Sequence, residues 1–116
     1  MAAGGQVATL ASPAYLANAA ANVLAAPSSG YNVIHHISIV NTGAATTFSL
    51  YLGATGGSAG GTQIGGGSFA LGANAREDIY FPSGLVQSTT QFLSGVCADA
   101  SRAVVTVLGT KHVSSV

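Results

Sequence analysis

The alternation of side chains along residues 31–40 constrains the fold more than any other feature of this sequence. Successive residues of an extended strand point to opposite faces of a sheet, and the β-branched residues of this segment favour an extended backbone. The two faces would carry Tyr31, Val33, His35, Ile37 and Ile39 on one side and Asn32, Ile34, His36, Ser38 and Val40 on the other. The sequence therefore predicts a β-strand here.

A turn and a second strand are predicted to follow this segment. Asn41, Thr42 and Gly43 are typical of a turn, because Asn and Gly tolerate left-handed backbone angles. Residues 46–52 then alternate again, with apolar side chains on one face and Thr47, Ser49 and Tyr51 on the other. The two strands together predict a hairpin.

Short strand patterns and turn residues continue through the rest of the chain. The strand patterns cover residues 68–71, 75–81, 85–86, 92–98 and 103–108, with turns at 72–74 and 82–84. Residues 53–67 hold half of the chain's 16 glycines, which predicts two loops flanking a brief edge strand at 62–64. This spacing predicts an all-β fold, a single antiparallel β-sandwich (jelly-roll-like or Ig-like) with Gly-rich loops.

The segment at residues 103–108 is apolar on both faces. A strand buried on both faces is either central in a sheet or pressed against another subunit. Val105 and Val107 are therefore candidate interface residues as well as candidate core residues.

The first 30 residues allow two interpretations. Ser12 followed by Pro13 is typical of a helix N-cap with proline at the first helical position, and apolar residues between 15 and 24 recur at helical spacing. Two asparagines interrupt that pattern, and every later segment is β. Consistency across the chain favours two more strands, near 6–10 and 23–26, over a short N-terminal helix.

A length of 116 residues predicts one compact domain over residues 1–116, with an N-terminal arm of about residues 1–12. The first residues lack a basic stretch followed by an apolar core, so no secretion signal is expected. No segment approaches the roughly 18 consecutive apolar residues of a membrane span, and no membrane partner is expected.

Charged residues make up only 5% of the chain, and the formal net charge is zero. About a quarter of an ordinary soluble domain is charged, and a neutral, sparsely charged surface tends to associate. We therefore expect this surface to lie against other subunits. Nucleic acid is not an expected partner, because phosphate recognition requires clustered Lys and Arg and this chain has three of these residues in total.

His35 and His36 are the first residues to consider as metal ligands. Adjacent side chains of a regular strand point to opposite faces, so the pair is not expected to hold one ion. The expected arrangement is one inward histidine, hydrogen-bonded in the core, and one outward histidine at an interface. A metal-dependent β-barrel enzyme that combines either histidine with His112 is the least favoured of three functional hypotheses.

Arg76, Glu77 and Asp78 form the one cluster of charges. Alternation puts the two carboxylates on opposite faces, which does not suit acid and base catalysis across one bond, and it predicts that Arg76 pairs with Asp78. The glycine runs match no phosphate-binding motif, and no serine lies in a Gly-x-Ser-x-Gly elbow. The single cysteine, Cys97, is expected to be a buried thiol. No catalytic residue, metal or cofactor is expected, and the chain is not expected to be an enzyme.

Several segments resemble small virion structural proteins of tailed bacteriophages, over about residues 10–107. The matching stretches are Ala-Pro-Ser-Ser-Gly at 26–30, Val-Ile at 33–34, His-Ile at 36–37, Ile-Val-Asn-Thr at 39–42, Leu-Tyr-Leu-Gly at 50–53 and Phe-Pro-Ser-Gly-Leu at 81–85. The resemblance is a pattern of packing and turn residues and contains no reactive group. It implies a small β-sandwich in a virus particle, as a capsid decoration protein or as part of a tail.

These observations favour a non-enzymatic structural component of a bacteriophage particle, made in the host cytoplasm and located in the virion on the outer capsid surface. The expected partners are further copies of the chain, as a trimer or another cyclic homo-oligomer, and the major capsid protein or other virion proteins. The interface candidates are Tyr51, Arg76, Asp78, Tyr80, Val105 and Val107. The alternative is a tail-associated or host-glycan-binding β-sandwich module, which the absence of Trp and the wide spacing of the four Tyr disfavour.

Overall fold

A computed structural model describes residues 6–57, 61–64 and 68–112 of the chain. The described residues form strands β1 (Gln6–Tyr15), β2 (Ala21–Leu24), β3 (Tyr31–Asn41), β4 (Thr46–Gly53), β5 (Thr62–Gln63), β6 (Phe69–Leu71), β7 (Arg76–Gln87), β8 (Phe92–Cys97) and β9 (Ala103–His112). In this part of the chain no helix has both the length and the apolar character needed to cross a membrane.

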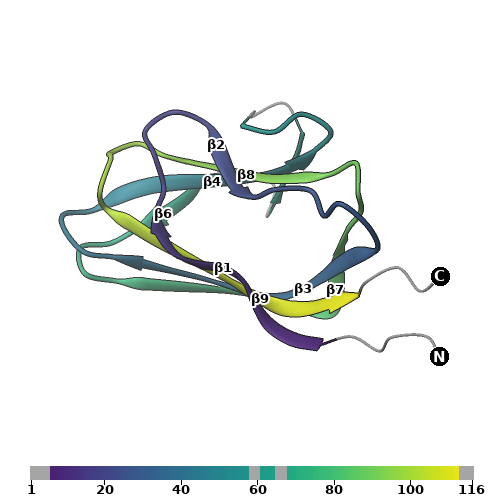
Figure 1. Cartoon of the computed structure of the whole chain (residues 1–116). Helices are drawn as coiled ribbons and strands as arrows, with labels where there is room; N and C mark the ends of the chain where they lie inside the picture. The colour runs from purple at the N-terminus through teal and green to yellow at the C-terminus, as the bar shows by residue number, and fades with distance from the viewer. Residues whose placement is uncertain (1–5, 58–60, 65–67, 113–116) are drawn as a thin grey trace.

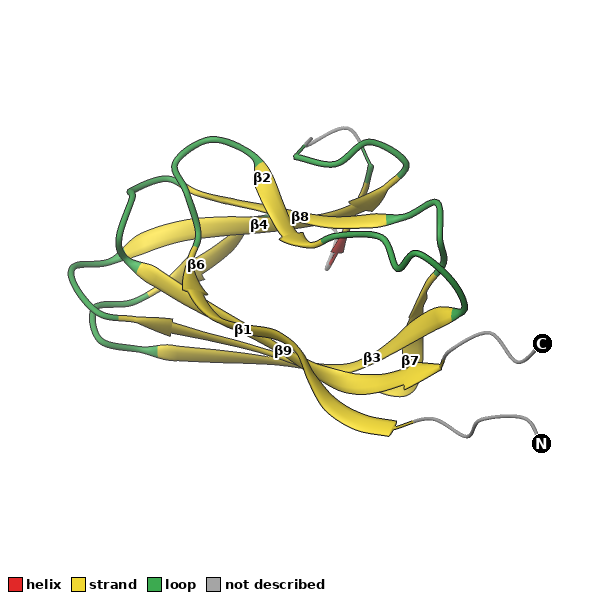
Figure 2. Ribbon diagram, in the orientation of Figure 1, coloured by secondary structure: helices red, strands yellow, loops and turns green. Residues whose placement is uncertain are grey.

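The strands divide between two antiparallel sheets that face each other (Figure 1). Sheet A has the order β1-β9-β3-β7, and sheet B has the order β2-β8-β4-β5, with β6 also pairing with β4. The first four strands alternate between the sheets, and β1 pairs with β9 near the other end of the chain (Figure 2). This connectivity is that of a jelly roll, and the prediction of an all-β antiparallel sandwich is confirmed.

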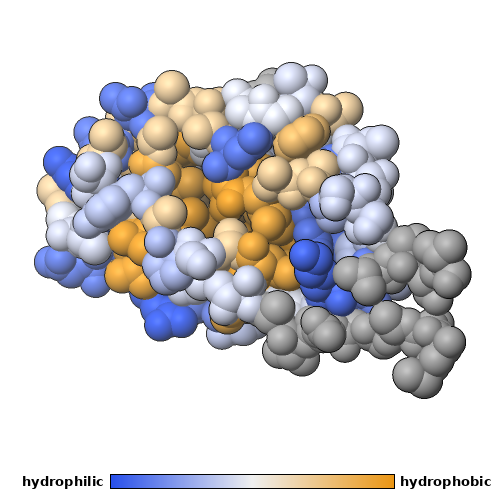
Figure 3. Space-filling model, viewed as in Figure 1, coloured by the Kyte–Doolittle hydropathy of each residue, from blue (hydrophilic) through white to orange (hydrophobic). Residues whose placement is uncertain are grey.

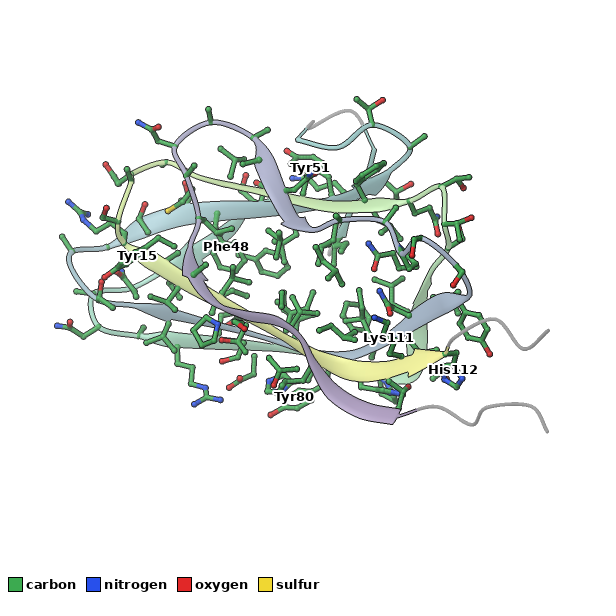
Figure 4. All side chains as sticks on the ribbon, viewed as in Figure 1. Tyr15, Phe48, Tyr51, Tyr80, Lys111 and His112 are labelled. Carbon is green, nitrogen blue, oxygen red and sulfur yellow. The ribbon has the colours of Figure 1, made fainter. Side chains whose placement is uncertain are left out.

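The hydrophobic core lies between the two sheets. Its largest wholly buried apolar side chains are Phe48, Ile34, Ile37, Ile39, Leu50, Leu93 and Val107. Phe48 stacks on Phe69 with ring centroids 4.9 Å apart, and Figure 4 shows Phe48 in the layer between the sheets. Full burial of one such side chain stabilises the fold by about 1.5–3 kcal/mol, so this layer supplies the main driving force for folding.

Strand β9 is central in sheet A, between β1 and β3. Val105 and Val107 point inward and are 3% and 0% exposed, so they belong to the core and cannot serve as the interface residues expected from the sequence. Their neighbours Val104 and Leu108 alternate to the outer face and are half-buried. Of the two alternatives for an apolar strand, the structure shows the central position.

The N-terminal segment is β, as the consistency argument favoured, and the short helix is not formed. Strand β1 pairs with β9 from Gln6 to Tyr15, with register shifts around residues 10 and 12–13. Because β1 is an edge strand with a bulge at Pro13, the missing N–H of that proline disrupts no ladder. Pairing with the distant strand β9 therefore outweighs the local helix pattern that begins at Ser12 and Pro13. Residues 6–12, which were expected to belong to an N-terminal arm, lie in sheet A.

Residues 82–84 were expected to form a turn between two strands, and that expectation is wrong. They form a bulge within β7, which is paired with β3 on both sides of it. The strand can include Pro82 because β7 lies at the edge of sheet A. Gly84 has φ 78°, and a Cβ at this position would overlap Cγ1 of Val33, so the bulge requires glycine.

The predicted turn at 41–43 is present, but the predicted hairpin is wrong, because β3 lies in sheet A, β4 lies in sheet B and the two strands do not pair. Asn41 stabilises the turn through its side chain. The residue is 2% exposed, its Oδ1 accepts from the Gly43 N–H at 2.9 Å, and its Nδ2 donates to the carbonyls of Ala44 and Gly72, both at 2.8 Å. The predicted edge strand at 62–64 is confirmed as β5, which pairs with β4. The glycines at 65–67 lie outside the described residues.

Candidate functional site

The outer face of sheet A gathers aromatic and imidazole side chains from all four of its strands. Paired residues of neighbouring strands lie on the same face, and the β3–β9, β3–β7 and β1–β9 registers place the following residues outward. They are Tyr15, Tyr31, His36, Tyr80, His112, Val104 and Leu108, which we call the aromatic face. Tyr15, Tyr31 and Tyr80 are 54%, 42% and 64% exposed. Figure 4 shows Tyr80 on the side of sheet A away from Phe48.

A β-bulge brings both adjacent histidines to this face. Ile34 pairs with Gly109 and His36 pairs with Leu108, so His35 is an extra residue in β3. His35 is exposed and lies 3.3 Å from Oγ1 of Thr110, which also faces outward. The expectation of one inward and one outward histidine is therefore wrong, because the strand is not regular at this point. The two faces predicted for residues 31–40 are wrong for the same reason: Tyr31 shares the outer face with His36, and Ile34 shares the core face with Ile37.

His36, Asp78 and Arg76 form a connected polar group at the centre of β3 and β7. Nε2 of His36 lies 2.8 Å from Oδ1 of Asp78, and Nε of Arg76 lies 2.9 Å from Oδ2 of the same carboxylate. The ring of Tyr80 stacks on His36 with centroids 4.4 Å apart and planes 8° apart. The predicted pairing of Arg76 with Asp78 is confirmed, and the positive and negative charges on this part of the face neutralise each other.

The same contacts determine how Asp78 titrates. The hydrogen bond from Arg76, and then the one from His36, lower the pKa of the Asp78 carboxyl below its ordinary value. The hydrogen bond to Asp78 in turn raises the pKa of Arg76. Both effects favour the charged forms of the pair.

The lowered pKa of Asp78 predicts a specific loss of stability in acid. The unfolded chain, in which the pKa of this carboxyl is ordinary, takes up the proton first. The stabilising contribution is therefore fully present above the unfolded pKa of about 4 and disappears as the pH falls through the lowered folded pKa. Urea unfolding at a series of pH values below 5 should show this loss in the natural chain and a smaller loss in Asp78→Asn. Equal pH dependence in the two proteins would contradict the assignment.

A second stacked pair lies at the end of the aromatic face nearer the chain termini. The rings of Tyr31 and His112 are 4.6 Å apart and nearly parallel, at 7°. A stacked contact of this kind between two aromatic rings is favourable in addition to the area that the rings bury. Among the described residues there is no group of three or more His, Cys, Asp or Glu side chains that could hold a metal ion.

The structure brings three of the six sequence-predicted site residues together. Arg76, Asp78 and Tyr80 alternate along the outer face of β7. Tyr51 faces outward from β4 in sheet B, on the opposite side of the sandwich, and the two valines are in the core. The sequence did not predict His36 as the partner of Asp78 and Tyr80. The alternation of residues 31–40 looks like that of a regular strand and does not reveal the bulge that turns His36 outward.

Comparisons with protein-family models, with curated proteins and with solved structures found no match to this chain. The fold and the aromatic face define a jelly-roll sandwich with one aromatic, sparsely charged sheet surface.

Proposed function

We propose that this chain is a non-enzymatic structural protein that assembles into a cyclic homo-oligomer on the outer surface of a bacteriophage capsid. The observation that supports the proposal most is the aromatic face, where three exposed tyrosines and outward apolar residues lie on the same sheet surface as a charge pair that neutralises itself. Interface cores are enriched in aromatic residues and depleted of unpaired charge. This composition suits contact between protein subunits.

The low charge of the whole chain points in the same direction. With 5% charged residues and no net charge, little repulsion opposes close packing of identical copies. Closed cyclic symmetry is the usual arrangement of homo-oligomers, and many symmetry-related copies bind a particle with avidity that one copy does not have. A trimer or ring on a capsid axis satisfies both conditions.

The assignment to a virus particle rests on the resemblance of residues 10–107 to phage virion proteins and on analogy of fold. Jelly rolls occur in viral capsid proteins and also in lectins. Analogy of fold alone does not establish function, so the particle assignment is tested separately from self-association.

Self-association is tested by light scattering of the purified chain from low to high micromolar concentration. We expect an oligomer that Tyr80→Ser and Val104→Asp shift toward the monomer, because both changes remove apolar contact from the aromatic face. Tyr51→Ser, on the other sheet, is the matched control and should leave the oligomer intact. A chain that stays monomeric at high micromolar concentration would contradict the proposal.

Location is tested on purified virions separated into heads and tails. Mass spectrometry should find the chain in the head fraction, together with the major capsid protein. Its presence in tails alone would favour the tail-associated alternative.

A second candidate function, binding of host glycans, is favoured by one observation. The sequence spaces its tyrosines widely, yet Tyr15, Tyr31 and Tyr80 lie on one face of sheet A. Tyr80 is next to the polar side chains of His36 and Asp78. Exposed aromatic rings with polar neighbours are suitable platforms for sugars. Binding on a glycan array that Tyr80→Ala abolishes would support this function, and an array without binding would count against it.

A further inference from the structure

All three histidines of this chain lie on the outer side of sheet A. His36 and His112 belong to the aromatic face, and His35 is the extra residue of the bulge in β3, exposed on the same side. Imidazole is the side chain that ordinarily changes its charge between pH 5 and pH 8. Mild acid therefore changes the charge of this one sheet surface.

The outer side of sheet A has little negative charge to balance new positive charge. The chain has three acidic residues, and Asp78 is the one that points outward from the described strands of sheet A. Glu77 alternates to the opposite side of β7, and Asp99 follows β8 of sheet B and accepts a hydrogen bond from Thr46 at 2.8 Å. On the side of the molecule that Figure 3 shows, strongly hydrophilic residues likewise form separate groups among apolar and intermediate ones.

Asp78 is already shared between two side chains. Its Oδ2 lies 2.9 Å from Nε of Arg76, and its Oδ1 lies 2.8 Å from Nε2 of His36. With a neutral imidazole this group has no net charge, and with a protonated imidazole it has one positive charge. The other neighbours of His36 add no charge, because the ring of Tyr80 stacks on it from β7 and Leu108 pairs with it from β9.

His35 and His112 have no carboxylate partner among the described residues. Nε2 of His35 lies 3.3 Å from Oγ1 of Thr110, and the ring of His112 stacks on Tyr31. The neighbouring charge on β9 is that of Lys111, which precedes His112 and starts from the inner side of the strand. A proton on either imidazole therefore adds a positive charge that no described carboxylate on this face neutralises.

The adjoining segments supply no opposite charge either. The bulge of β7 at residues 82–84, where Gly84 lies beside the ring of His35, consists of uncharged residues. Strand β1, which pairs with the other side of β9, has Tyr15 as its one ionisable side chain. The protonation of the three imidazoles thus determines the net charge of the face.

We propose that pH regulates the contact between copies of this chain, which associate through the aromatic face near pH 7.5 and separate near pH 5.5. This regulation rests on the proposed self-association through the same face. Burial between subunits disfavours the charged form of an imidazole, and like charges brought together at an interface repel each other. Separated copies, whose imidazoles face water, therefore take up protons more readily, so that proton uptake favours separation.

Light scattering of the full chain at one high micromolar concentration, at pH 7.5 and at pH 5.5, tests the proposal. We expect an oligomer at pH 7.5, a dissociation constant about tenfold or more higher at pH 5.5, and recovery of the oligomer on return to pH 7.5. Circular dichroism should show the same β signal at both pH values, because Asp78, whose pKa is lowered, keeps its charge at pH 5.5.

The outcomes separate this proposal from the proposed self-association. An oligomer that is equally stable at both pH values overturns the regulation and leaves self-association standing. A chain that is monomeric at both pH values overturns both.

Glutamine substitutions identify the groups that respond, because glutamine is polar but does not titrate. His35→Gln and His112→Gln should each reduce the pH dependence, and the triple variant that also contains His36→Gln should have the same dissociation constant at both pH values. Tyr51→His, added to the triple variant, puts an imidazole on the outer side of sheet B and is the matched control. Unreduced pH dependence in both single variants, or its return with Tyr51→His, overturns the assignment to the aromatic face; the single variants decide the question where the triple variant does not assemble.

Discussion

Replacing Val107 with aspartate is expected to leave the chain unfolded. Val107 is wholly buried between the sheets at the centre of β9, where a carboxylate would have neither water nor an opposite charge. An unpaired buried charge costs more than about 4 kcal/mol, which is a large part of the 5–15 kcal/mol that stabilises a typical domain. Circular dichroism should show loss of the β signal at room temperature.

Val104→Asp is the matched control for this prediction. It introduces the same group three residues earlier in the same strand, but on the outer face, where Val104 pairs with Val40 beside Arg76. This variant should fold, with a loss of about 1 kcal/mol from the lower β propensity of aspartate, and should fail to assemble. If Val107→Asp folded as well as Val104→Asp, the inward and outward assignment of β9 would be incorrect.

Replacing Gln87 with methionine is expected to have the second largest effect. Methionine has a similar length but cannot form the hydrogen bonds of the buried amide, which connects β2, β3 and the start of β8. The change leaves the Leu24 and Gln91 carbonyls and the Asn32 amide without their partner. At about 1–3 kcal/mol for each of these three unsatisfied groups, the loss of unfolding free energy should be on the order of 3–9 kcal/mol.

Urea unfolding followed by circular dichroism measures this loss, since the chain has no Trp for fluorescence. The control is Val86→Met, one residue earlier, whose side chain is 53% exposed on the outer face. Its stability should stay within about 0.5 kcal/mol of that of the natural chain. Equal stability of the two variants would show that the Gln87 network does not hold the strands together.

Part of the candidate site could be predicted from the sequence. Arg76, Asp78 and Tyr80 alternate within one strand, so their common face follows from the two-residue period. Their partner His36 could not be predicted, because the bulge at His35 depends on how β3 pairs with both β7 and β9. Tyr31 and His112 come from distant parts of the chain, and only the strand register makes them neighbours.

The sequence by itself determined that the segments of β3, β4 and β9 are strands and that the fold is a sandwich, but not that β3 and β4 lie in different sheets. These features depend on local periodicity and on turn residues, which act over a few residues of chain. Tertiary structure decided that the N-terminal segment is an edge strand on β9, that residues 82–84 form a bulge and that both histidines face outward. The physical reason is that register and bulges are set by hydrogen bonding and packing between distant strands, and no local pattern encodes the partner.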